Sequence, residues 1–164
     1  MTGAAGSAGR PPESRPEDGS VNTVVVKHTA GTKYVATVRG HEVLVDQPLA
    51  DGGTDEAPSP VELFVISLAT CVAYFAGQYL KRHGVSRAGF TVNAEYRKTG
   101  RPARVPSLNL RVSVPAGLPV GLVKPLHAVV SHCTVHNSLL EPPSIDIKID
   151  SEPGAALDYS TDAP

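Results

Sequence analysis

Two cysteines, Cys71 and Cys133, carry the most specific chemistry in this chain of 164 residues. A free thiol is either a small hydrophobic group in the core or, as a thiolate, a nucleophile. His132 and His136 flank the second cysteine, so a metal site that also includes Cys71 is one alternative. The spacing matches no ordinary zinc site, however, and leaves a metal without a further matched anchor. We therefore predict reduced thiols with redox chemistry and neither a metal nor a cofactor, and keep inert core thiols as the other alternative.

Cys71 lies in the most apolar stretch of the chain, and this stretch carries the signals of a long helix. Its start, Ser59-Pro60-Val61-Glu62, has the pattern of a capping box with proline at the first helical position. Gly84 follows three basic residues, as expected where a helix ends. Almost every position between is apolar or small, so a helix over residues 60–83 should be buried on most sides. Four polar residues interrupt the run, so we predict a core helix rather than one that spans a membrane.

The rest of the chain shows the pattern of short strands joined by tight turns. We predict strands over residues 21–29, 33–39, 42–46, 90–97, 108–114 and 145–149, from β-branched composition and alternation of apolar with polar positions. A second helix is expected within residues 119–133, where Pro125 should kink it or delay its start. Residues 134–140 are expected to form a short turn, which Pro142 and Pro143 end.

This order, βββ-α-ββ-α-β, predicts an α+β fold in which two main helices pack on an antiparallel sheet. We expect one domain over residues 21–150, a disordered tail over residues 1–20 and a polar tail over residues 151–164. So small a domain cannot easily cover a helix that is apolar all round. A homodimer with these helices inside is therefore predicted.

The overall charge favours no polyanionic partner. The net charge is −1, and lysine and arginine are scattered rather than clustered. We expect no nucleic-acid partner and no membrane partner. No secretion leader is recognised, so we expect a cytoplasmic protein with reduced thiols.

Two segments of the sequence resemble the OsmC/Ohr family of thiol peroxidases and their relatives. The first is Ser59-Pro60-Val61-Glu62-Leu63 with Cys71 eight residues after the leucine, and the second is His132-Cys133-Thr134-Val135-His136-Asn137-Ser138-Leu139. The resemblance covers about residues 24–149. It implies an OsmC-like, intertwined α+β homodimer in which Cys71 is the peroxidatic thiol and Cys133 the resolving thiol. Organic hydroperoxides would be reduced to alcohols through a sulfenate and an intramolecular disulfide, and a dithiol reductant would restore the enzyme.

A peroxidatic thiol must be a thiolate, and burial in apolar surroundings disfavours that charged form. One unit charge about 4 Å away supplies about 4 kcal/mol at an effective dielectric constant of about 20, which is enough to offset the penalty. The resemblance implies an arginine from the N-terminal strands, and Arg39 is the candidate. Arg97 and Arg111 are the substitutes if Arg39 points outward.

Glu62 is the candidate for the acidic residue that orients this arginine. In the hydroperoxide reductases of the family that acid stands ten residues before the cysteine, where this chain has Val61. Nine residues of helix rise about 13.5 Å and turn about 180°, so Glu62 cannot touch Cys71 of its own helix. It could reach the thiol or an arginine of a partner subunit, or serve only as a helix cap. The displaced acid keeps open an alternative function: an OsmC-like module that binds a small molecule or a partner and has no peroxidase activity.

Overall fold

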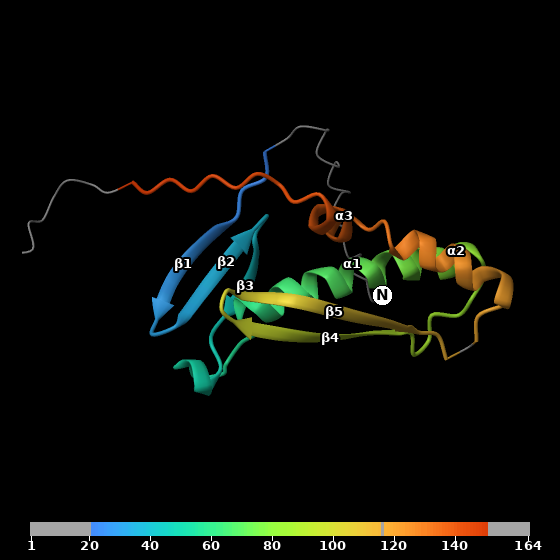
Figure 1. Ribbon diagram of the computed structural model, residues 1–164, viewed down its shortest axis with the longest axis horizontal. Helices are drawn as coiled ribbons and strands as arrows, with labels where there is room; N and C mark the ends of the chain where they lie inside the picture. The colour runs from blue at the N-terminus through green and yellow to red at the C-terminus, as the bar shows by residue number, and fades with distance from the viewer. Residues whose placement is uncertain (1–20, 116, 151–164) are drawn as a thin grey trace, which may run out of the picture. The chain divides into compact units, whose positions relative to one another are not determined.

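The computed structural model describes residues 21–115 and 117–150 (Figure 1). It consists of two compact units, of which the first ends at Phe64 and the second begins at Val65. The tails predicted over residues 1–20 and 151–164 lie outside the described residues, and the single domain over residues 21–150 stays a prediction.

The first unit contains a three-stranded antiparallel sheet. Its strands are β1 (Val25–Ala30), β2 (Lys33–Val38) and β3 (His41–Val45), in the order β1-β2-β3. The turn from β2 to β3 has positive φ at both central residues, 49° at Arg39 and 77° at Gly40, which is the pattern of a type I′ hairpin turn. The three predicted N-terminal strands and the tight turn are confirmed, with small shifts at the strand ends.

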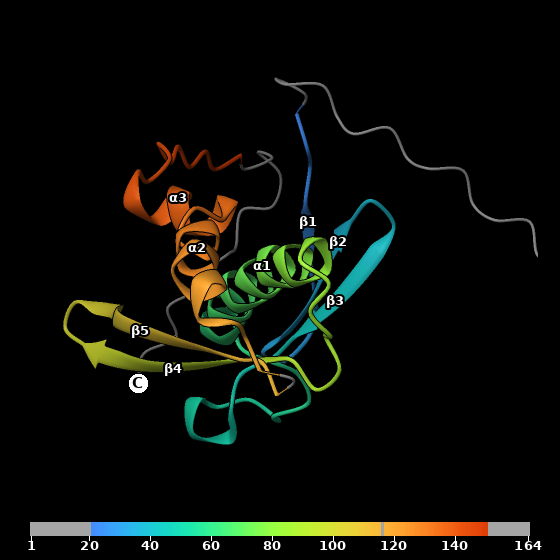
Figure 2. The ribbon, with the colours of Figure 1, turned by 90° about the vertical axis from the view of Figure 1, so that its right-hand side faces the viewer.

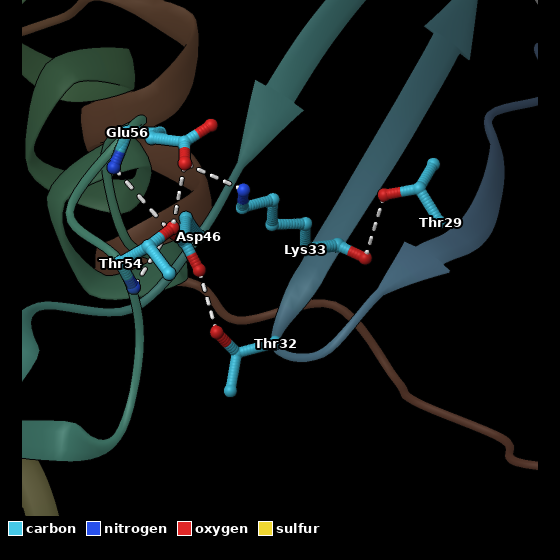
Figure 3. A network of polar contacts seen from close by, with 6 residues as sticks. All are labelled: Thr29, Thr32, Lys33, Asp46, Thr54 and Glu56. Carbon is cyan, nitrogen blue, oxygen red and sulfur yellow. Dashed lines mark hydrogen bonds and ion pairs between the residues drawn. The ribbon is translucent and has the colours of Figure 1, made fainter.

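Asp46 anchors the loop that follows β3 (Figure 3). Its side chain is fully buried and accepts hydrogen bonds from the Thr32 hydroxyl at 2.5 Å and from the Thr54 hydroxyl at 2.7 Å. The backbone N–H groups of Thr54 and Glu56 donate to the same carboxylate at 3.1 and 3.3 Å. Glu56 in turn forms an ion pair of 2.6 Å with Lys33 of β2. The network joins the sheet to the loop, which includes a short 3₁₀ helix, η1 (Leu49–Asp51).

A glycine is required at position 53 of this loop. A β-carbon added there would lie 1.8 Å from the Gln47 carbonyl oxygen, which is far inside van der Waals contact. Gly52, beside it, has a φ of 83° and caps η1 in the left-handed conformation that glycine adopts without strain. The loop is therefore compact because its two glycines let the backbone fold back on itself.

Helix α1 (Pro60–Arg82) begins and ends as its sequence signals predict. Glu62 accepts hydrogen bonds from the backbone N–H and the hydroxyl of Ser59, at 2.7 and 2.8 Å, and its own N–H donates to the Ser59 hydroxyl at 3.4 Å. At the other end Gly84 has a φ of 67°, and Val85 N–H donates to Leu80 C=O at 3.0 Å. These are a capping box and a Schellman-type end. The predicted start is confirmed, and the helix ends one residue earlier than expected.

The second unit is built on a long hairpin with helices on one of its faces. The hairpin comprises β4 (Thr91–Gly100) and β5 (Ala103–Ser113), and α2 (Val120–Val130) and α3 (Thr134–Leu140) follow. Antiparallel pairing places Val92, Ala94 and Tyr96 opposite Val112, Leu110 and Leu108. These half-buried residues alternate with exposed polar residues, as predicted for strands that cover one face. Figure 2 shows α1 and α2 on the same side of this hairpin, where Ala76 and Tyr79 of α1 pack with Leu126 of α2.

One prediction about the helices is wrong. Residues 134–140 form helix α3 rather than a turn, because the Cys133 side chain caps the first turn by accepting a hydrogen bond from His136 N–H. The second helix lies within residues 119–133 as predicted, and of the two alternatives for Pro125 the late start is excluded, since α2 begins at Val120 and runs through Pro125. The protein therefore has three α-helices among its described residues, where two main helices were expected.

Two predictions about the strands are also wrong. The five strands of the described residues form two separate sheets of three and two strands rather than one antiparallel sheet. The expected final strand at residues 145–149 is not formed: the segment belongs to no sheet, and its three isoleucines are 81–90% exposed. Alternation alone cannot make a strand, because every strand needs a neighbouring edge to bond its backbone.

Helix α1 is only partly covered within the chain. By length and composition it is the one helix in the described part of the chain that could cross a membrane, with a mean hydropathy of 1.7. Val65, Leu68, Val72, Ala76 and Leu80 are buried, as in a core helix. On the remaining surface Ile66 is 44% exposed and Tyr74 58% exposed. Within the described residues the helix is therefore not buried on most sides, and the expected cover from a second subunit stays a prediction.

The Asp46 network predicts a pH-dependent contribution to stability. Hydrogen bonds to its carboxylate hold the pKa of Asp46 well below its ordinary value of 3.8, the bond from Thr32 contributing most. A lowered folded-state pKa means that this stabilisation is present above about pH 4 and is lost as the pH falls below it. Asp46→Asn should therefore lower the midpoint of thermal unfolding by several degrees at pH 7, and the difference from the wild type should shrink on acidification.

Asp55→Asn is the matched control, because Asp55 lies in the same loop, is exposed, and has a φ of 58° that asparagine also tolerates. It should leave the midpoint unchanged at every pH. Equal effects of the two substitutions would show that Asp46 does not anchor the loop.

Candidate functional site

Helix α1 presents Cys71 to a small apolar cluster in the second unit. Leu68 and Val72, the buried neighbours of Cys71 on the helix, pack with Cys133, and the half-buried Cys71 lies against them. The sheet contributes the apolar face of its hairpin to the same cluster, through Val92, Leu108, Leu110 and Val112. The structure therefore brings together the two cysteines that the sequence analysis singled out, from positions 62 residues apart.

Cys133 is completely buried and stands at the start of α3. Its backbone is extended, with φ −70° and ψ 152°, and its Sγ accepts a hydrogen bond from His136 N–H at 3.4 Å. Its carbonyl accepts the first helical bond, from Asn137 N–H at 2.9 Å. These are the contacts of an N-cap residue, a position that serine, threonine or aspartate usually fills. The cap fixes the thiol where the helix begins.

Burial raises the pKa of the Cys133 thiol. The hydrogen bond from the His136 backbone lowers it and so opposes part of that rise, whereas a hydrogen bond with Cys71 and the charge of a Cys71 thiolate raise it further. The raised pKa favours the neutral form of the Cys133 thiol.

The histidines beside Cys133 act through their backbones in this structure. His136 donates its N–H to the Cys133 sulfur, and the carbonyl of His132 accepts from the Asn137 side chain at 3.3 Å. Residues 21–115 and 117–150 contain no group of three or more histidine, cysteine, aspartate or glutamate side chains that could hold a metal ion. The geometry thus gives the alternative of a metal site no support.

Arg97 and Arg111 do not face the thiols. Arg97 pairs with Ser107 and Arg111 with Asn93, on exposed positions that alternate with the apolar ones. Their side chains therefore lie on the opposite face of the hairpin from the cysteine cluster. The structure excludes both as substitute cations for a thiol of the same chain.

The other two predicted site residues lie in the first unit. Arg39 is exposed in the type I′ turn between β2 and β3, and Glu62 is bound to Ser59 in the capping box of α1. The cap role predicted for Glu62 is thus confirmed. The catalytic roles predicted for Arg39 and Glu62 stay predictions.

The helix that positions the second thiol, α3, was not predicted from the sequence. Because residues 134–140 were expected to form a turn, Cys133 was not identified as a helix cap. Val135 and Leu139 are four residues apart, which is a helical spacing, and Pro142 lies just beyond the end of the helix. This pattern is the signal that could have identified α3.

A protein-family model for OsmC-like proteins matches residues 53–148. The match covers more than half of the sequence and contains both cysteines. The chain therefore belongs to the OsmC-like protein family, as its resemblance to OsmC/Ohr proteins predicted.

Solved structures share this fold at low sequence identity. A protein of Psychrobacter arcticus, provisionally described as an osmotic-stress-induced and detoxification-response protein, is 22% identical with a TM-score of 0.67, over 74% of this chain and 90% of that one. An organic hydroperoxide resistance protein OsmC of Legionella pneumophila is 18% identical with a TM-score of 0.51, over 73% and 90%. A Vibrio cholerae protein, provisionally described as an organic hydroperoxide resistance protein, holds captopril in one of its active sites. It is 17% identical with a TM-score of 0.53, over 76% and 88%. No curated protein matches the sequence.

The unequal exposure of the two thiols predicts unequal reactivity. Cys71 is half-buried and Cys133 completely buried, so iodoacetamide should modify Cys71 in the native protein at least about ten times faster. Peptide mass spectrometry over a time course measures both rates. In urea the two thiols should react at similar rates, which is the control. Faster modification of native Cys133 would contradict the arrangement.

Proposed function

We propose that this protein is a thiol-dependent peroxidase that reduces organic hydroperoxides. The observation that carries the proposal is the contact of a half-buried Cys71 with a completely buried Cys133 in one apolar cluster. Such a pair can be oxidised by a substrate at the outer thiol and can then close an internal disulfide. Membership of the OsmC-like family supports this assignment, because both cysteines lie within the family match.

The reaction has three balanced steps. The Cys71 thiolate attacks the terminal oxygen of the hydroperoxide, so that an S–O bond forms, the O–O bond breaks, and the alkoxide takes up a proton and leaves as the alcohol. Cys133 then attacks the sulfur of the resulting sulfenic acid, forming the disulfide, while the displaced hydroxide leaves with the Cys133 proton as water. An external dithiol reduces the disulfide by exchange and restores both thiols.

The order in which the two thiols react follows from their surroundings. Burial raises the pKa of Cys133, so this group stays protonated and does not compete for the hydroperoxide. Its position against Cys71 suits it to the second step. The apolar side chains of the cluster favour substrates with an alkyl or aryl group over hydrogen peroxide.

Arg39 is the proposed cation that stabilises the Cys71 thiolate, as the family resemblance implies. Glu62 is the proposed positioning residue of this arginine. Its contacts with Ser59 at the start of α1 are those of a cap, and any effect of Glu62 on catalysis would act through Arg39.

A small-molecule-binding module without peroxidase activity is the second candidate. Val61 stands where the hydroperoxide reductases of the family have their acidic residue, and this observation favours a branch with another activity. The Vibrio cholerae neighbour, which holds captopril in one of its active sites, supports this candidate, since a protein of this fold can bind a small molecule. The peroxide assay below separates the two candidates.

The wild-type protein should consume cumene hydroperoxide in the presence of a dithiol such as dihydrolipoamide. Cys71→Ser removes the nucleophile and should lower the rate at least about 100-fold. Cys133→Ser should complete one turnover and then stop, with a sulfenic acid at Cys71 that dimedone traps. Hydroperoxide loss and dimedone adducts are measured by absorbance and mass spectrometry.

Circular dichroism of both variants serves as the control for folding. If the wild type consumes hydroperoxide no faster than Cys71→Ser, the proposed peroxidase function is wrong. The small-molecule-binding module is then the remaining candidate. If Cys133→Ser still completes many turnovers with a dithiol, Cys133 is not the resolving thiol. The peroxidatic role of Cys71 would not be affected by that result.

Arg39→Met should slow hydroperoxide consumption at pH 7 by up to about 1,000-fold, which corresponds to the loss of about 4 kcal/mol from one unit charge about 4 Å from a thiolate. Raising the pH should restore the rate, because hydroxide then generates the thiolate without the arginine. Arg97→Met is the matched control, since Arg97 lies on the far face of the hairpin, and it should leave the rate unchanged. Equal rates for the two variants would exclude Arg39.

A further inference from the structure

Cys133 stands at the corner between α2 and α3, where residues 131–133 connect the two helices. The corner is fixed on one side by α2, because the backbone N–H of His132 donates to the Val129 carbonyl at 3.3 Å. The course of these three residues therefore decides where the buried Cys133 sulfur lies.

Asn137, one turn into α3, holds the corner from the other side. Its side-chain Nδ2 donates to the His132 carbonyl at 3.3 Å, and its backbone N–H donates to the Cys133 carbonyl at 2.9 Å. His132 is thus bound to both helices, through its N–H to α2 and through its carbonyl to α3. The Asn137 side chain therefore ties the start of α3 to the end of α2 across Cys133.

Helix α3 has few other contacts in the described part of the chain that would fix its position. None of its seven residues is buried, and Val135 is its one apolar residue that packs against the cluster of the cysteines. A helix of this length is marginal in isolation. Its polar contacts at the corner therefore matter for its placement, although a single hydrogen bond contributes only about 1 kcal/mol.

Placement matters because the Cys133 thiol cannot rely on charge to react. Burial raises the pKa of this thiol and favours the neutral form, which is the weaker nucleophile. Its attack on the Cys71 sulfur then depends on proximity, and a disulfide accepts only a narrow geometry, with sulfurs about 2.05 Å apart and a dihedral angle of about 90°. A displacement of about 1 Å can slow such a step about 100-fold.

We propose that Asn137 is a positioning residue for the resolving thiol, because its side-chain amide ties α3 to α2 and so holds the Cys133 sulfur in reach of Cys71. The inference rests on the proposed resolving role of Cys133 and deepens it. Asn137 acts through the backbone of its neighbours and not on the reacting atoms. Its loss should therefore slow the closure of the disulfide and leave the reaction of Cys71 with hydroperoxide unchanged.

Asn137→Asp is the most direct variant, since aspartate has the same shape but carries a carboxylate oxygen in place of the donating amide nitrogen. It cannot donate to the His132 carbonyl, and the two oxygens repel each other. A negative charge near the start of a helix interacts favourably with the helix dipole, so the substitution does not weaken α3 in itself. Asn137→Ala, which removes the contact without adding charge, is measured in parallel.

The first test follows a single turnover with one equivalent of cumene hydroperoxide and no dithiol. Samples are quenched with dimedone over time, and mass spectrometry measures the sulfenic acid at Cys71 and the disulfide. In Asn137→Asp the sulfenic acid should form at the wild-type rate, whereas its conversion to the disulfide should be at least about ten times slower. Asn93→Asp is the matched control, because it makes the same chemical change at an exposed position of β4, opposite Arg111, and it should match the wild type in both steps.

The second test needs no hydroperoxide. Glutathione disulfide forms a mixed disulfide with Cys71 and releases one reduced glutathione. Cys133 then attacks the Cys71 sulfur, the bond to glutathione breaks, and the Cys133 proton leaves with the second reduced glutathione. The glutathione concentrations at half oxidation give the effective concentration of Cys133 at Cys71, which should fall at least about tenfold in Asn137→Asp and stay unchanged in Asn93→Asp.

Three outcomes would overturn the assignment. Disulfide closure in Asn137→Asp that is as fast and as favourable as in Asn93→Asp would show that the amide does not position Cys133. Equal slowing of both steps would show a general structural role, and so would loss of the native circular dichroism in both Asn137 variants. The two proposals fail separately: a wild type that consumes no hydroperoxide refutes the peroxidase, while the glutathione equilibrium still decides the role of Asn137.

Discussion

The packing of helix α1 against the apolar face of β4 and β5 is the constraint on which the thiol chemistry depends. Leu68 and Val72 meet Cys133 in this layer, and Cys71 lies beside them on the same helix. The same packing excludes water from Cys133 and so keeps its proton in place. Two thiols are thus held together with different exposure, Cys71 half-buried and Cys133 completely buried.

The capping interactions decide where these groups lie along the chain. Ser59 and Glu62 set the start of α1, which determines which face of the helix Cys71 occupies. Cys133 sets the start of α3 with its own sulfur. The cap therefore fixes the position of the Cys133 sulfur relative to the start of α3.

The unfinished surfaces have a common physical origin. Apolar residues of α1 are exposed, β1 has an open edge, and residues 145–149 have the alternation of a strand without a neighbour. Each is a feature that a single chain of this size cannot bury. The strand expected at residues 145–149 is not formed among the described residues.

Local signals determined most of what could be predicted from the sequence. Turn glycines, alternation and capping residues identified five strands, α1 and its cap, because these depend on neighbours only a few residues away. The two cysteines and the family they indicate were also evident from residue type and spacing. Tertiary structure alone decided that the strands form two sheets, that Cys133 is the buried thiol and caps α3, and that Arg97 and Arg111 face away from it. These properties depend on which distant segments share a face, and no pattern within a short window carries that information.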